Sequence, residues 1–92
     1  MNESDVVNLI VKLASEGNYI YKRHARIRMI ERNLTDNDVL EILLDPNILR
    51  IDTDNEDGIT SYKIEGGIHK HRLAIKFDEE SMIIIITVMD KR

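Results

Sequence analysis

The hydrophobic positions of this 92-residue chain change their spacing halfway along it. In the first half they recur every three or four residues, the spacing of one helix face, over residues 2–17, 21–32 and 35–45. Thr35 followed by Asp38 resembles a capping box, which marks the start of a helix. The first half therefore predicts three helices.

The second half predicts strands. The strands are expected at residues 48–52, 59–65, 69–77 and 82–89. Gly66 and Gly67 tolerate the positive backbone angles of a tight hairpin turn, and the last run, MIIIITVM, is typical of a central strand covered on both faces. The pattern predicts one α+β domain over residues 1–92. Its two or three N-terminal helices should pack on one face of a three- to four-stranded antiparallel sheet.

Composition narrows the class of protein. There is no cysteine, which excludes disulfides and thiolate metal sites and fits a reducing compartment. The longest apolar run spans about eight residues, whereas a membrane helix needs about 20. No signal peptide is visible. We therefore expect a soluble cytoplasmic protein with no membrane attachment.

Charge is unevenly distributed along the chain, although the net charge is −4. Residues 22–32 hold five Lys or Arg against one Glu, and residues 69–76 hold three more basic side chains and two histidines. Eight carboxylates lie between Asp36 and Asp57. Such segregation can focus an anionic ligand onto one surface, or it can produce two solvated faces.

The basic segment also has a helical pattern. His24, Arg28 and Arg32 are four residues apart and should stack on one helix face. The apolar stripe beside them consists of Tyr21, Ala25 and Met29. An imidazole between guanidiniums suits phosphate chemistry, because histidine titrates near neutrality and arginine stays charged. The alternative is a packed histidine on a solvated basic helix.

A family resemblance rests on the run HARIRMIERNLTDNDVLEIL, followed by a glycine hairpin, an Arg-containing strand and IIIITVM. These features resemble a family of small uncharacterised bacterial and archaeal domains, related to the MqsR and RelE-like toxins and often encoded beside a zinc-finger-type antitoxin. The resemblance covers roughly residues 21–89, with Asn33 where the family commonly has Gly. It implies a RelE-like fold and a metal-independent endoribonuclease, held silent by a partner antitoxin.

Metal-free RNA cleavage needs a proton-transfer group and cations, because the attacking nucleophile is the 2′-hydroxyl of the RNA itself. We predict His24 as general acid or base, with Arg28 and Arg72 gripping the phosphate. The expected substrate-binding residues are Arg32, Tyr62 and Lys76. This chemistry requires no metal and no cofactor.

Other interpretations stay open. The domain could be a non-catalytic module that binds nucleic acid or protein, and a homodimer is compatible with the sequence. A metal site built from His24, His69 and His71 is a third interpretation. Strand alternation also poses a geometric problem, because Arg72 and Lys76 should lie on the face away from the helices. His24 would then reach them only around an edge of the sheet.

Overall fold

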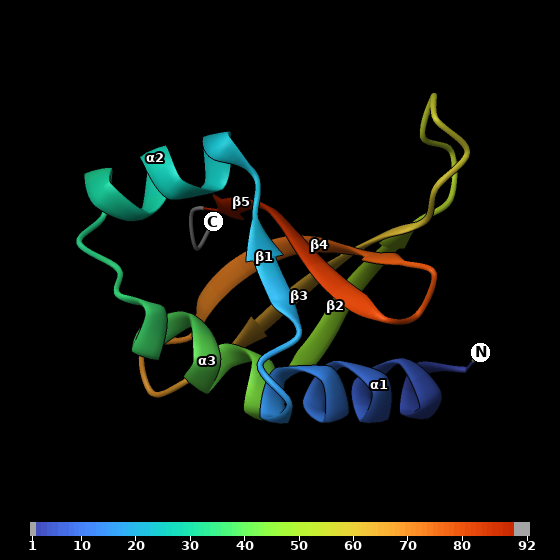
Figure 1. The fold of residues 1–92 in the computed structure, drawn as a ribbon, viewed down its shortest axis with the longest axis horizontal. Helices are drawn as coiled ribbons and strands as arrows, with labels where there is room; N and C mark the ends of the chain where they lie inside the picture. Colours follow the sequence, from blue (N-terminus) through green and yellow to red (C-terminus); the bar gives the residue numbers. More distant parts are fainter. Residues whose placement is uncertain (1, 90–92) are drawn as a thin grey trace.

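The computed structural model describes residues 2–89, which form three helices and five strands (Figure 1). The helices are α1 (Glu3–Ser15), α2 (Arg23–Glu31) and α3 (Asp36–Leu44). The strands are β1 (Tyr19–Tyr21), β2 (Asn47–Asp52), β3 (Ser61–Gly66), β4 (His71–Asp78) and β5 (Met82–Met89). They form one sheet in the order β1-β5-β4-β3-β2. The predicted α+β class is confirmed.

The sheet is mixed and has more strands than predicted. β1 pairs in parallel with β5, Tyr21 lying opposite Ile85, and the other neighbours are antiparallel. The prediction that the second helix begins at Tyr21 is therefore wrong, because this residue belongs to a strand and α2 begins at Arg23. A three-residue strand is too short to show a period of two, so the pattern merged it with the helix.

Two helix starts agree with the sequence. Asn2 caps α1, and Thr35 caps α3 by accepting a hydrogen bond from the Asp38 backbone N–H at 3.2 Å. The Asp38 carboxylate in turn accepts from the Thr35 N–H at 2.8 Å. Asn33, after α2, has φ 55°, as expected for the residue that closes a helix.

The core lies between the sheet and the helices. α1 and α3 contact each other along one side of the sheet, while α2 follows β1 and packs on β5 (Figure 1). Leu73 and Ile75 of β4 are fully buried, whereas Arg72 and Lys76 alternate with them and lie on the other face, here called the open face. The predicted alternation along β4 is confirmed.

Three details of the second half differ from the prediction. The prediction that β5 is covered on both faces is wrong. Only Ile83, Ile85 and Val88 of this strand are fully buried, because the open face holds charged side chains of β3 and β4 rather than a second apolar layer. The hairpin turn also spans residues 67–70, so β4 does not begin at residue 69. Gly66 is the last residue of β3 and not part of the turn. A Cβ at this position would lie 2.8 Å from the Asp45 carbonyl oxygen, so the glycine permits close packing against the end of α3.

The β2 strand forms one edge of the sheet. Its register with β3 shifts between Ile48 and Arg50, which leaves Leu49 in a bulge. Leu49 and Ile51 are both exposed. No helix within residues 2–89 has the length and apolar character needed to cross a membrane.

Candidate functional site

The predicted stack of basic residues lies on helix α2 and at its C-terminal end. Ala25 and Met29 are buried in the core as predicted, while His24 is exposed and Arg28 is half-buried beside the packed seam. Arg32 follows the helix directly, and its backbone N–H donates to the Arg28 carbonyl at 3.1 Å. The three basic residues therefore lie one helical turn apart.

Arg28 has an unusual environment for a helix arginine. Its Nε is buried and has no hydrogen-bond partner among the described residues. Its Nη1 lies 3.9 Å from the Glu31 carboxylate, which is a loose ion pair. Buried donors are normally satisfied, so this Nε is unusual, and an anion would meet only the exposed part of the guanidinium, whose side chain is 31% exposed.

Tyr21, Arg26 and Asp36 connect α2 to α3. The Arg26 guanidinium lies 4.9 Å from the centre of the Tyr21 ring and 3.2 Å from an Asp36 oxygen. Burial raises the pKa of Tyr21, and the neighbouring Asp36 carboxylate raises it further, although the hydroxyl lacks a well-aligned hydrogen bond to any described residue. Arg26 is thus used to position α2.

The open face brings Arg72 and Lys76 onto one surface, and each lies near a carboxylate. Arg72 Nε is 2.8 Å from Glu65 Oε2 on the neighbouring strand. Lys76 Nζ is 3.7 Å from Asp57 Oδ2 in the loop between β2 and β3. Four residues along a strand separate the Cα atoms of Arg72 and Lys76 by about 13 Å. No described contact joins His24 to either of them.

Tyr62 lies on the core face. It is opposite Ile75 in the ladder, it is buried, and its ring centre lies 5.5 Å from that of Phe77. Burial raises the pKa of its hydroxyl. The structure therefore separates Tyr62 from Arg72 and Lys76, and its surroundings are those of a packed core tyrosine.

A groove crosses the open face between the sheet and the β2–β3 loop. It consists of two adjoining cavities of about 410 and 500 Å³ that share Asn55, Ser61 and Ile86, and we call it the open-face groove. Lys22 and Lys76 line its first cavity. Lys22 precedes α2 and Lys76 belongs to β4, so the two basic segments of the sequence meet here.

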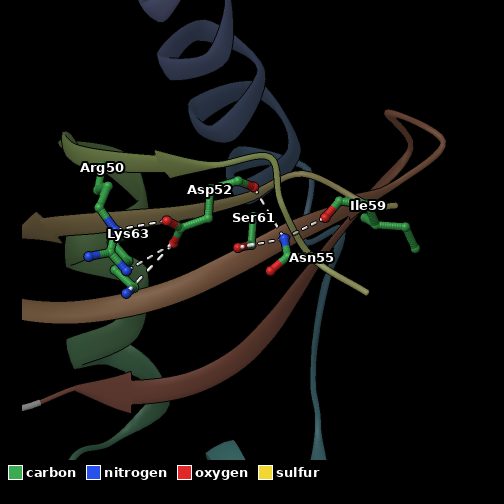
Figure 2. A network of polar contacts seen from close by, with 6 residues as sticks. All are labelled: Arg50, Asp52, Asn55, Ile59, Ser61 and Lys63. Atoms are coloured by element: carbon green, nitrogen blue, oxygen red, sulfur yellow. Dashed lines mark hydrogen bonds and ion pairs between the residues drawn. The ribbon is translucent and has the colours of Figure 1, made fainter. Parts of the chain in front are cut away.

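The second cavity contains another cationic group. Arg50 and Lys63 line it, and both pair with the Asp52 carboxylate at 2.8 Å and 3.6 Å (Figure 2). The hydrogen bond from Arg50 is the main cause that lowers the pKa of Asp52. One carboxylate therefore holds two of the cations on this face.

Asn55 fixes the shape of the loop. Its side-chain amide donates to the Asp52 carbonyl at 3.1 Å, the Ile59 carbonyl at 2.6 Å and the Ser61 hydroxyl at 3.2 Å (Figure 2). These bonds tie both ends of the loop to one side chain. The loop is consequently held as a wall of the open-face groove.

Sequence reasoning missed several groove residues. Lys63 could have been found, because it lies opposite Ala74 and so shares the open face with Arg72 and Lys76. The pattern places Lys22 in a basic helix, whereas in the structure its position depends on strand β1, which the pattern does not reveal. Nothing in the sequence marks Asn55 as the loop anchor.

The histidines do not assemble into a metal centre. The rings of His69 and His71 lie 5.8 Å apart near the hairpin. Within residues 2–89 there is no group of three His, Asp or Glu side chains that could hold a metal ion. The alternative site made from His24, His69 and His71 is therefore not formed.

The protein is thus a small α+β domain with charged residues on the open face of its sheet. The chain belongs to the family described as Domain of unknown function (DUF4258), whose family model matches residues 21–90. The match takes in α2, α3 and strands β2 to β5, and it leaves out α1. No curated protein and no solved structure matches the chain. The predicted membership of a small uncharacterised family is confirmed, while the relation to toxins stays a prediction.

Proposed function

We propose that this protein is a toxin-like endoribonuclease that binds RNA along the open-face groove and cleaves it without a metal. The observation that carries the proposal is that Lys22 and Lys76 line one cavity. This cavity joins the two basic segments of the chain at the start of α2, two residues before His24. His24 lines neither cavity, so the proposal requires a bound polyanion to extend past Lys22 to reach the exposed imidazole.

The chemistry assigns a role to each predicted residue. The 2′-hydroxyl of RNA attacks the adjacent phosphorus, and His24 transfers a proton to or from the reacting oxygens. Arg28, with its buried Nε, and Arg72 stabilise the more negative phosphorane. Arg32 and Lys76 hold neighbouring phosphates. Tyr62, buried against Phe77, contributes packing rather than base stacking.

A protein partner is the second part of this proposal. Ile27 and Ile30 are 46% and 78% exposed on the outer side of α2, beside its cations. The two isoleucines are three residues apart, so they share one helix face that a partner could cover. A cognate antitoxin in the cytoplasm would silence the enzyme by covering α2. Light scattering on the purified chain distinguishes a monomer from a homodimer.

A non-catalytic RNA-binding module is the second candidate function. It is favoured by the lack of any described contact that joins Arg72 or Lys76 to His24. A binding protein tolerates cations that are spread over a surface, whereas a nuclease needs them to converge on one phosphate.

Cleavage of a mixed-sequence RNA in EDTA tests the proposal. The parent protein is compared with His24→Ala, Arg28→Ala and the matched control His69→Ala, which removes an exposed histidine at the hairpin. Cleavage that is lost in the first two variants and kept in the control supports the nuclease. RNA retention without cleavage selects the binding module, and absence of both contradicts RNA as the substrate.

A further inference from the structure

The β2–β3 loop places an acid against a lysine of the open-face groove. Asp57 Oδ2 lies 3.7 Å from Lys76 Nζ, and its Oδ1 accepts a hydrogen bond from the Ile59 backbone N–H at 2.9 Å. The Lys76 side chain is only 15% exposed and lines the first cavity, so Asp57 lies against a largely buried lysine. The carboxylate thus occupies the position at which an anionic ligand would meet Lys76.

The other cavity of the groove repeats this arrangement. Asp52 contacts both Arg50 and Lys63 through its two oxygens (Figure 2). Phosphate and carboxylate compete for the same guanidinium and ammonium donors. Two carboxylates therefore cover three of the four cations that line the open-face groove.

We propose that Asp52 and Asp57 are resident competitors of RNA phosphates, so that the open-face groove is autoinhibited by its own acids. This inference rests on the RNA binding proposed above and describes its regulation. RNA enters only by breaking these ion pairs. No ion pair among the described residues holds Lys22, so Lys22 is the first groove cation that a phosphate meets.

Because the β2–β3 loop is anchored, Asp52 and Asp57 compete with phosphate only for the cations beside them. Because the Asn55 amide ties the loop to β2 and β3, the carboxylates stay near their cations without any movement of the loop. A phosphate must then displace a carboxylate at fixed geometry. The number of phosphates bound should therefore depend on these two acids and not on the total charge of the loop.

Asp57→Asn isolates the competing charge. An asparagine Oδ1 still accepts the Ile59 N–H, so the loop keeps this bond while Lys76 loses its carboxylate. Asp54→Asn is the matched control, because it removes the same charge from the same loop at a residue that lines the second cavity but makes no ion pair within residues 2–89. Circular dichroism melting of both variants confirms that they are folded.

Binding of a fluorescein-labelled 12-nucleotide single-stranded RNA is measured by anisotropy over a range of salt concentrations. In Asp57→Asn we expect affinity to rise several-fold. The slope of log affinity against log salt should steepen by about 0.7, the value for one added phosphate contact on a single strand. Asp54→Asn should leave the slope unchanged. Lys76→Ala combined with Asp57→Asn should abolish the gain in slope.

Each failure has a distinct meaning. If the parent protein binds RNA and the two asparagine variants behave alike, the ion pair is irrelevant and the inference is overturned while RNA binding stands. If Asp57→Asn binds RNA with the parent's affinity and slope, the inference is again overturned alone. If neither the parent nor any variant binds, the proposed function fails and the inference fails with it.

Discussion

Helices α2 and α3 have the same length, nine residues, and differ in what holds them together. α3 begins with a complete capping box between Thr35 and Asp38 and carries acids in its first turn. α2 has no side-chain cap and no acid in its first turn, where the charge of Arg23 opposes the helix dipole. α3 is specified by its own residues, whereas α2 depends on contacts with the rest of the fold.

We take this difference as support for the proposed role of α2 in ligand binding. α2 is held by Ala25 and Met29 in the core and by the Arg26 contact with Tyr21 and Asp36. The rest of its surface carries cations and exposed isoleucines that contribute little to its own stability. A helix with charges unfavourable to itself is a candidate for a surface selected for binding.

The largest expected effect concerns the core side of α3. Leu43 is fully buried, so Leu43→Ala should lower the free energy of unfolding by about 3 kcal/mol through lost burial and a cavity. Urea denaturation measures this loss. The neighbouring Leu44 is 43% exposed, and Leu44→Ala is the control. Equal losses in the two variants would contradict the packing described for α3.

The capping box should give the next largest effect. Thr35→Ala removes the side-chain acceptor for the Asp38 N–H, and we expect a loss of about 1 kcal/mol in unfolding free energy. Thermal melting of this variant beside Ser15→Ala, whose hydroxyl only bonds back to the Val11 carbonyl, separates capping from hydroxyl loss. A similar change in both would argue against the cap.

The same box predicts a dependence on acid. The hydrogen bond from the Thr35 backbone N–H is the main cause that lowers the pKa of Asp38 below its ordinary value of 3.8. A group with a lowered folded pKa stabilises the fold above its unfolded pKa, and this contribution is lost as pH falls through the folded value. Asp38→Asn should therefore flatten the fall in melting temperature below pH 4. An unchanged acid profile would show that other carboxyls dominate.

Adding a cap to α2 should have a smaller and opposite effect. Lys22 occupies the cap position with φ −70° and ψ 154°, which suits a serine. Lys22→Ser should stabilise the fold by about 0.5 kcal/mol and weaken RNA binding, because a groove lysine is lost. Melting and anisotropy on the same sample measure the two effects. A lower unfolding free energy together with unchanged RNA affinity would refute the proposal that α2 serves RNA binding at the expense of its own stability.

The smallest effect on stability is expected at the outer surface of α2. Ile30→Gln should change the unfolding free energy by less than about 0.5 kcal/mol, because this side chain contributes little to the core. It should reduce self-association at high concentration, measured by light scattering. A larger loss of stability would mean that Ile30 packs within the folded chain.

The fold was predictable where local rules decide it. The Thr35 cap, the left-handed Asn33 and the alternation along β4 follow from the properties of single residues and their neighbours. β1 was not predictable, because three residues become a strand only through pairing with β5, more than sixty positions away. The role of Gly66 was likewise hidden, since it depends on how closely α3 approaches β3.

The candidate site was predictable only in part. The spacing of His24, Arg28 and Arg32 follows from helix geometry, and Arg72 and Lys76 share a face because strands alternate. Their carboxylate partners come from a neighbouring strand and from a loop whose shape depends on Asn55. Sequence patterns predict which residues share a surface, but they do not predict which of them are already paired.

The edge strand β2 carries features that oppose pairing with the edge of another molecule. An edge with free backbone groups and the apolar side chains Leu49 and Ile51 could pair with the same edge of another molecule. The bulge at Leu49 breaks the regular spacing of that edge, and Arg50 and Asp52 charge it on the open face. The same two residues that neutralise each other beside the open-face groove thus also act as gatekeepers against strand-to-strand aggregation.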